Sequence, residues 1–163
     1  MADHDIRTAG IDDVPSLRGL IAELAEFENL THLMKATEAD LRESLFGPDP
    51  GAEALLLFPK GATAPVAFAL FFHNYSTFLG RRGLWLEDIY VQAPHRRKGY
   101  GSALLLRVAR IAHERRCGRL EWAVLDWNVE AQRFYASLGA TLLPDWRITR
   151  VTGEALERLA AQS

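Results

Sequence analysis

The sequence predicts an α/β (α+β) fold: a mixed, mostly antiparallel central sheet with helices on both faces and a central parallel β-α-β crossover. Three strand-like runs follow one another between residues 52 and 91, separated by short stretches rich in glycine and proline, which is typical of an antiparallel meander. A helix and another strand come next, and a strand-helix-strand unit implies a parallel crossover. Apolar residues at helical spacing mark the helices that would cover the sheet.

The first half of the chain begins with a short strand at Asp5–Thr8 and a helix at Ile11–Glu28, whose apolar residues recur every three or four positions. A shorter helix at Glu38–Leu45 follows. Thr37 and Asp40, three residues apart, form the capping pair expected at its start. The strands of the meander are expected at Ala52–Phe58, Val66–Tyr75 and Leu84–Val91.

The second half continues the alternation of helices and strands. Its expected elements are a helix at Tyr100–Arg116, a strand at Arg119–Leu125, a helix at Val129–Leu138, a strand at Trp146–Val151 and a terminal helix from Glu154. Asn128 is a good N-cap for the second of these helices, and Gly139 a good stop for it. No repeat or low-complexity linker interrupts the order, so residues 1–163 are expected to form a single domain.

The composition limits the classes of partner. The net charge is −2, which does not favour nucleic acid or an anionic membrane as a general partner. No run of 18 apolar residues and no secretory leader are visible. The single cysteine, Cys117, cannot form an internal disulfide and favours a reducing compartment. We therefore expect a soluble, cytoplasmic protein, and we expect no metal because five histidines and one cysteine make no zinc pattern.

The stretch HRRKGYGSALL, residues 95–105, combines three cations, two glycines and a helix start. The first turn of a helix offers unpaired N–H groups, glycines let a ligand approach them, and the helix dipole adds positive potential. These features predict a pyrophosphate cradle. The alternative is a plain strand–helix turn with a solvated basic flank. A Walker loop does not fit, because Gly99-Tyr100-Gly101-Ser102 lacks the lysine that it needs. A dinucleotide-binding fingerprint does not fit either, because Leu104 takes the place of the third glycine.

Residues 96–101, Arg-x-x-Gly-x-Gly, resemble the acyl-CoA loop of the GNAT superfamily of N-acetyltransferases. Residues 128–139, Asn-x-x-Ala-x-x-Phe-Tyr-x-x-x-Gly, resemble the later signature of the same superfamily. Three segments, IRTAGIDDVPSLRGLIAELAEFE, WLEDIYV and NVEAQRFYASLGA, are similar to spermidine/spermine (diamine) and thialysine N-acetyltransferases. The similarity covers most of Ile6–Ala140 and implies a GNAT-like fold.

The resemblance implies a binding site for acetyl-CoA as cosubstrate. It assigns this site to Ile89, Tyr90 and Val91 of a strand, to Arg96, Arg97, Lys98, Gly99, Tyr100, Gly101 and Ser102 of the loop, and to Asn128, Val129, Glu130, Ala131 and Tyr135 of the later helix. The pantetheine arm would pair with the strand backbone, and the pyrophosphate would lie on the loop amides. The polyamine enzymes have a further glycine where this chain has Arg97.

The resemblance also implies two catalytic residues. Tyr135 matches the general acid, and a phenol with a pKa near 10 is protonated at neutral pH and can protonate the departing thiolate. Glu87 matches the group that takes a proton from the substrate ammonium. On the other interpretation, Tyr135 is a core aromatic residue, and Glu87 and Asp88 only hold a neighbouring arginine. No nucleophile elbow is present, so we expect direct transfer in a ternary complex.

The implied acceptor is a primary amine of a small molecule, a polyamine, a diamine or a lysine-like compound. The resemblance places it beside Phe27, Glu28, Glu87, Asp88 and Trp122. On the alternative interpretation, the carboxylates from Glu23 to Glu28 are solvated charges on the helix surface and do not belong to a site. The alternatives for the protein are a non-catalytic acyl-CoA-binding regulatory module and a protein or peptide N-acetyltransferase. A homodimer is expected from the family.

Overall fold

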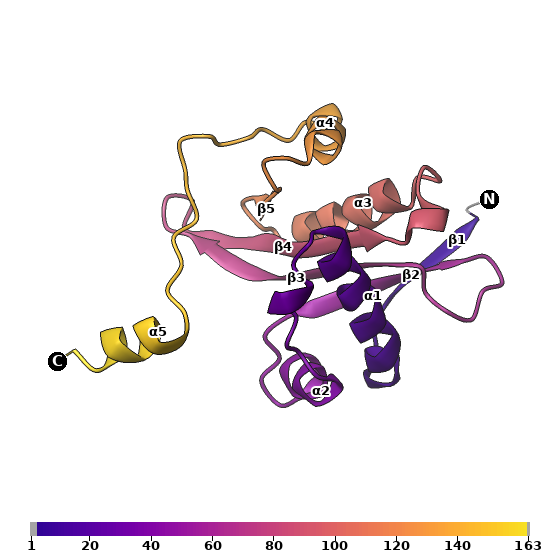
Figure 1. Cartoon of the computed structure of the whole chain (residues 1–163). Helices are drawn as coiled ribbons and strands as arrows, with labels where there is room; N and C mark the ends of the chain where they lie inside the picture. Colours follow the sequence, from indigo (N-terminus) through magenta and orange to yellow (C-terminus); the bar gives the residue numbers. More distant parts are fainter. Residues whose placement is uncertain (1–2, 163) are drawn as a thin grey trace. The chain divides into compact units, whose positions relative to one another are not determined.

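The computed structural model describes residues 3–162 and divides into two compact units, residues 1–123 and residues 124–163. The first unit holds the sheet, and the second holds two helices joined by irregular chain (Figure 1). The expectation of one domain over residues 1–163 stays a prediction.

The sheet has five strands in the order β1-β2-β3-β4-β5. They are β1 (His4–Thr8), β2 (Glu53–Pro59), β3 (Ala67–Ser76), β4 (Arg81–Val91) and β5 (Leu120–Trp122). The first four pair antiparallel to their neighbours, and β4 pairs parallel to β5. The mixed, mostly antiparallel sheet and its central parallel crossover are thereby confirmed.

The α-helices lie close to their expected positions. They are α1 (Val14–Phe27), α2 (Glu38–Phe46), α3 (Tyr100–Glu114), α4 (Val129–Ser137) and α5 (Gly153–Ala160), with short 3-10 helices at Ile11–Asp13, Thr31–Leu33 and Ala93–His95. The predicted capping pair is confirmed: the Asp40 amide donates to the Thr37 hydroxyl at 3.1 Å, and the Thr37 amide donates to the Asp40 carboxylate at 2.8 Å.

Helices cover both faces of the sheet, as predicted (Figure 1). Residues that alternate along the strands, such as Leu56 and Phe68, form one core with Leu17 and Leu24 of α1. The opposite face carries α3, which contacts β2, β3 and β4. Because Leu104 and Val108 of α3 are fully buried, this second contact also removes apolar surface from water.

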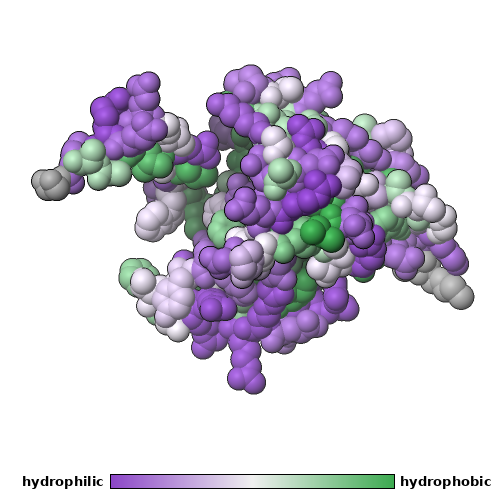
Figure 2. Space-filling model, turned by 90° about the horizontal axis from the view of Figure 1, so that it is seen from below, coloured by the Kyte–Doolittle hydropathy of each residue, from purple (hydrophilic) through white to green (hydrophobic). Residues whose placement is uncertain are grey.

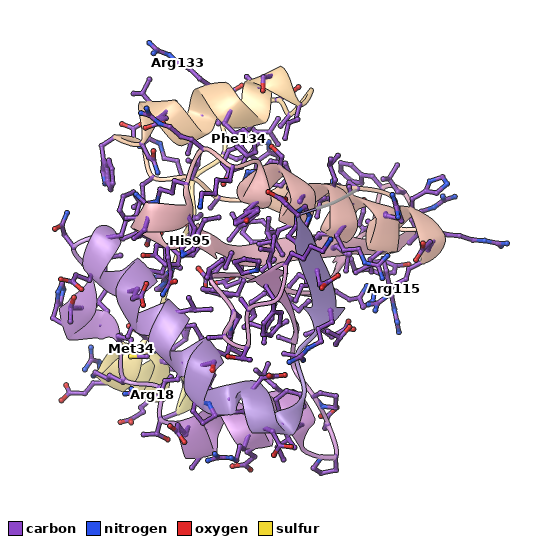
Figure 3. The ribbon with its side chains drawn as sticks, turned by 90° about the vertical axis from the view of Figure 1, so that its right-hand side faces the viewer. Arg18, Met34, His95, Arg115, Arg133 and Phe134 are labelled. Carbon is purple, nitrogen blue, oxygen red and sulfur yellow. The ribbon has the colours of Figure 1, made fainter. Side chains whose placement is uncertain are left out.

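Polar contacts fix the far end of α3. Arg115, labelled in Figure 3, follows the helix and donates to both carboxylate oxygens of Glu53 in β2, at 2.6 and 2.8 Å. The same guanidinium lies 3.1 Å from His73 of β3, whose other ring nitrogen lies 3.2 Å from the Gly83 carbonyl. These contacts join α3 to three strands.

Two strand predictions differ from the structure. The strand expected at Arg119–Leu125 is shorter and covers Leu120–Trp122. The strand expected at Trp146–Val151 is wrong, because no β structure is assigned to that segment. A strand needs a partner for its backbone N–H and C=O groups, and within the described range no strand pairs with this segment.

The second unit is held by local contacts. The Asn128 side chain accepts a hydrogen bond from the Ala131 amide at 3.2 Å, which confirms the predicted N-cap of α4. Gly139 has φ +88, the left-handed conformation typical of a helix stop. No residue from 124 to 162 is buried, and Trp146 and Ile148 are 80% and 70% exposed. This unit therefore has no apolar core of its own.

No helix within residues 3–162 is long and apolar enough to cross a membrane. Viewed from the side of α1 and α2, the surface is mostly hydrophilic, with apolar residues in smaller patches (Figure 2).

Candidate active site

A β-bulge in β4 places two adjacent carboxylates. Leu86 pairs with Phe71 of β3 and Asp88 pairs with Leu70, so Glu87 is an extra residue without an opposite partner. The register puts Asp88 and Tyr90 on the face that packs against α1. The Glu87 carboxylate accepts a hydrogen bond from the Trp85 indole at 2.9 Å, and Trp85 lies on that same face by register.

Beyond the bulge, one edge of β4 is open. The parallel partner β5 pairs only with Leu84–Leu86, and within residues 3–162 no other strand continues along that edge. On the β3 side, the backbone amide of Gln92 donates to the Val66 carbonyl at 3.0 Å. Because hydrogen-bonded and non-hydrogen-bonded pairs alternate in an antiparallel ladder, the backbone groups of Ile89 and Val91 point to the open edge.

The loop after β4 brings helix amides next to this open edge. The first hydrogen bond of α3 runs from the Ala103 amide to the Gly99 carbonyl at 2.9 Å. The amides of residues 100–102 therefore have no acceptor inside the helix. A Cβ added at Gly101 would stand 3.9 Å from a methyl group of Val91, so the bare face of this glycine lies against the end of β4.

The same loop contains two left-handed residues. Gly99 has φ +79, which suits glycine, and Arg97 has φ +61, which is costly for a residue with a Cβ. Arg97 is the position where the polyamine enzymes that the sequence resembles have a glycine. The side chain at this position therefore introduces backbone strain into the loop.

Arg96 differs from the neighbouring cations in its contacts. Its Nε donates to the Val91 carbonyl at 3.0 Å, which occupies one acceptor on the open edge. Its guanidinium carbon lies 4.5 Å from the centre of the Phe27 ring and 5.6 Å from that of Tyr90. This side chain therefore lies toward the end of α1.

A cavity of about 480 Å³ lies between the C-terminal half of α1 and the end of β4. It is lined by Glu23, Glu26, Phe27, Tyr90, Gln92, Ala93, Pro94 and Arg96. Glu23 accepts hydrogen bonds from the Gln92 amide group at 2.9 Å and from the Tyr90 hydroxyl at 3.3 Å. The interpretation of Glu23 as a solvated helix charge is therefore wrong.

Carboxylates next to this cavity carry perturbed pKa values. Burial, together with the nearby charges of Glu87 and Glu28, raises the pKa of Asp88 to about 6. Burial also raises the pKa of Glu28 above its ordinary range. Glu28 and Glu87 therefore lie close enough to Asp88 to act on its ionisation. The site roles that the resemblance gives to these three carboxylates stay predictions.

Two other predicted site residues, Trp122 and Tyr135, belong to elements other than β4 and α1. Trp122 is the last residue of β5, and its register partner is Leu86, which lies on the face opposite to Asp88. Tyr135 lies in α4 of the second unit, with its ring centre 5.3 Å from that of Phe134, which Figure 3 labels. The site roles of Trp122 and Tyr135 stay predictions.

Two side chains that position site residues were not predicted from the sequence. These are the indole of Trp85, which holds Glu87, and the side chain of Gln92, which holds Glu23. Period-two alternation in β4 relates Asp88, Tyr90 and Gln92 to one face and was an available signal for Gln92. The contact between Trp85 and Glu87 depends on the bulge, and no local sequence pattern predicts a bulge at this position.

Comparison with known proteins identifies the family. The family model described as "Acetyltransferase (GNAT) family" matches residues 19–140. The chain belongs to the GNAT acetyltransferase family. It is an acyltransferase by this membership.

Relatives and structures agree with this assignment. The acetyltransferase is 39% identical to the thialysine N-epsilon-acetyltransferase of Bos taurus, over 99% of this chain and 100% of the relative. It is 35% identical to the L-ornithine N5-acetyltransferase of Arabidopsis thaliana, over 94% and 86%. An integron cassette protein from the mobile metagenome of V. cholerae shares the fold with a TM-score of 0.82 at 24% identity, over 99% and 100%.

Among residues 3–162 no group of three or more histidine, cysteine, aspartate or glutamate residues is placed to hold a metal ion.

Replacing Asp88 tests the electrostatic cost at the centre of the acetyltransferase. The pKa of this carboxyl rises from an ordinary 3.8 to about 6 on folding, so its ionisation opposes folding above pH 6 and has no effect below about pH 3.8. Asp88→Asn should therefore raise the free energy of unfolding at pH 8 by up to about 3 kcal/mol, and by much less at pH 4.5. Urea unfolding at both pH values measures this difference.

The control for this experiment is Asp49→Asn, which changes an exposed loop aspartate. It should alter the stability by less than about 0.5 kcal/mol at either pH. An Asp88→Asn effect of equal size at pH 4.5 and pH 8 would contradict a raised pKa.

Because the backbone at Arg97 is left-handed, glycine should be more stabilising than alanine at this position, the reverse of the order in a helix. Arg97→Gly and Arg97→Ala remove the same charge, but the glycine variant should be more stable than the alanine variant by about 1 kcal/mol because it adopts φ +61 without strain. Arg110, in the interior of α3, is the matched control, where glycine should be less stable than alanine by about 1 kcal/mol. Equal thermal stability of the two position-97 variants would show that the loop is not strained there.

Proposed function

We propose that this protein transfers an acetyl group from acetyl-CoA to a primary amine of a small molecule, a polyamine, a diamine or a lysine-like compound, by direct attack in a ternary complex. The observation that carries the proposal is the open edge of β4 beside the uncapped start of α3, in a chain of the GNAT family. The names of the relatives, which act on thialysine and L-ornithine, support a small amine as acceptor.

The cosubstrate would bind along the open edge and the loop. Its pantetheine amides would pair with the outward backbone groups of Ile89 and Val91, in the manner of an added strand. Its pyrophosphate would lie on the amides of residues 100–102, where the helix dipole and the nearby Arg97 and Lys98 favour negative charge. When bound, acetyl-CoA supplies the activated acetyl group.

The carboxylates of β4 would prepare the amine. An alkyl ammonium with a pKa near 10 is almost wholly protonated at neutral pH and cannot attack a thioester. Glu87, held by Trp85, and Asp88, whose raised pKa of about 6 lies near the working pH, are the groups to receive that proton and pass it to water. Glu28 would add a third negative charge that attracts the cation.

The departing thiolate needs a proton, and the resemblance assigns this task to Tyr135. A phenol is protonated at neutral pH and is therefore a competent donor. The N-cap of α4 by Asn128 supports the assignment of this helix to the second GNAT signature.

The proposal is tested by measuring CoA thiol release with a panel of small amines. Tyr135→Phe should lower kcat by about 100-fold or more while acetyl-CoA still binds, because only the proton donor is lost. Tyr75→Phe, a change at an exposed tyrosine of β3, is the matched control and should leave the rate unchanged. Equal rates for Tyr135→Phe and the wild type would remove Tyr135 from the mechanism.

The assay also separates the alternative functions. Acetyl-CoA binding in calorimetry without turnover of any amine would indicate a non-catalytic acyl-CoA-binding regulatory module. Turnover of a lysine-containing peptide in preference to every small amine would indicate a protein or peptide acetyltransferase.

We further propose that the protein works in the cytoplasm as a homodimer. The lone Cys117 supports a reducing compartment. The second unit supports self-association, because its large apolar side chains are exposed and soluble monomers rarely keep such surfaces free. They are Leu138, Leu142, Leu143, Trp146, Ile148, Val151, Leu156 and Leu159.

Light scattering at micromolar concentration should give twice the chain mass of 18.3 kDa. Trp146→Asp should shift the protein toward the monomer, because it places a charge within the exposed apolar segment. Thr141→Asp, at an exposed polar position of the same unit, should leave the mass unchanged. A monomeric wild type would contradict the dimer.

A further inference from the structure

The start of α3 is not held by a side-chain cap. Gly99 stands at the N-cap position with φ +79, and within the described chain no cap side chain accepts a hydrogen bond from the first turn. The two preceding residues, Arg97 and Lys98, are exposed and form no ion pair within residues 3–162. The amides of residues 100–102 therefore need another support if they are to keep their direction before a ligand binds.

The ring of Tyr100 supplies this support. Tyr100 is the first residue of α3, yet it is only 4% exposed. Its ring centre lies 5.4 Å from that of His4 in β1, with the planes 64° apart, and 6.5 Å from that of His95, with the planes 20° apart. Both distances are within the range of favourable aromatic pairs. The three rings therefore join β1 and the 3-10 helix at Ala93–His95 to the first residue of α3.

The imidazole of His95, labelled in Figure 3, is placed by its ring and not by its nitrogen atoms. Its Nδ1 is buried and has no hydrogen-bond partner among residues 3–162. A buried polar atom without a partner lowers stability, so hydrogen bonding does not explain the position of this side chain. The contact that the ring makes is its stacking on Tyr100. A phenylalanine would offer the same flat surface without the buried nitrogen.

The imidazole of His4 connects β1 to the loop in a second way. Its Nδ1 lies 3.0 Å from the carboxylate of Asp3. The pKa of Asp3 is lowered first by this hydrogen bond and further by the positive charge of Lys98. Asp3 therefore lies near enough to Lys98 for their charges to interact. The beginning of β1 thus supports the loop through an aromatic ring and through a charge.

We propose that His4 and His95 are positioning residues for the diphosphate of acetyl-CoA, and that they act through the ring of Tyr100. The ring and the first free amide of α3 belong to the same residue, so holding the ring also holds the direction of that amide. This inference rests on the proposed function and adds two residues that lie outside the Arg-x-x-Gly-x-Gly motif. Both act on the diphosphate, at a distance from the thioester and the amine.

The test compares acetyl-CoA with S-acetylpantetheine, which carries the same thioester and pantetheine arm but no diphosphate. His95→Ala should raise the KM for acetyl-CoA by about fivefold or more at unchanged kcat, because the amides lose their direction while the reacting groups are untouched. The kcat/KM for S-acetylpantetheine should change by less than about twofold. His4→Ala, which removes the other ring from the stack, should have an effect in the same direction.

Three further measurements serve as controls. His95→Phe keeps a flat ring against Tyr100 and should keep the KM for acetyl-CoA within about twofold of the wild type. His113→Ala changes an exposed histidine in the last turn of α3 and should leave the kinetics with both donors unchanged. Calorimetric titration with CoA should give a Kd that rises in His95→Ala by the same factor as the KM for acetyl-CoA.

Two outcomes overturn the inference and leave the proposed function intact. One is a His95→Ala variant, folded by circular dichroism, whose kcat/KM falls equally with both donors, because the effect is then not specific to the diphosphate. The other is an unchanged affinity for CoA in both His95→Ala and His4→Ala. Failure to acetylate any amine with either donor would contradict the proposed function, and the CoA titrations would then decide the inference alone.

Discussion

The bulge at Glu87 is the feature on which the rest of the site depends. Pairing between β4 and β5 ends at Leu86, and the extra residue follows immediately. A bulge bends its strand and increases the local twist, which separates β4 from its parallel neighbour and opens an edge. The same extra residue places two adjacent carboxylates near the α1 face. One local irregularity thus accompanies both the open edge proposed for the cosubstrate and the carboxylates proposed for the amine.

The buried apolar layers compensate for this arrangement. Asp88 is partly buried beside two other carboxylates, and the energetic cost of its ionisation appears as a raised pKa. The apolar cores on the two faces of the sheet, with fully buried residues such as Phe68 and Leu104, stabilise the fold and offset the energetic cost of ionising Asp88. Arg97 adds backbone strain in the loop. Asp88 and Arg97 therefore both lower the stability of the fold.

Much of the fold was predictable from the sequence because the signals are local. Helix periodicity, the Thr37–Asp40 capping pair and the turn residues between strands each act within a few residues. The strand predicted at Trp146–Val151 was wrong, because a strand pattern in the sequence does not show whether a partner strand is available to pair with it. The bulge was equally hidden, since it depends on the register against β3. Glu87 and Asp88 are adjacent in the sequence, but the bulge at Glu87 lies in strand pairing that the sequence does not display.

The open edge of β4 has a further consequence for the unliganded protein. A strand with free N–H and C=O groups is a template for other extended chains, and therefore a site for aggregation. This edge is kept short, because β5 covers its beginning and the bulge interrupts its regularity. Arg96 then occupies the Val91 carbonyl near its end. The bulge, β5 and Arg96 therefore limit the addition of a foreign β-strand at the same edge that is proposed to bind the cosubstrate.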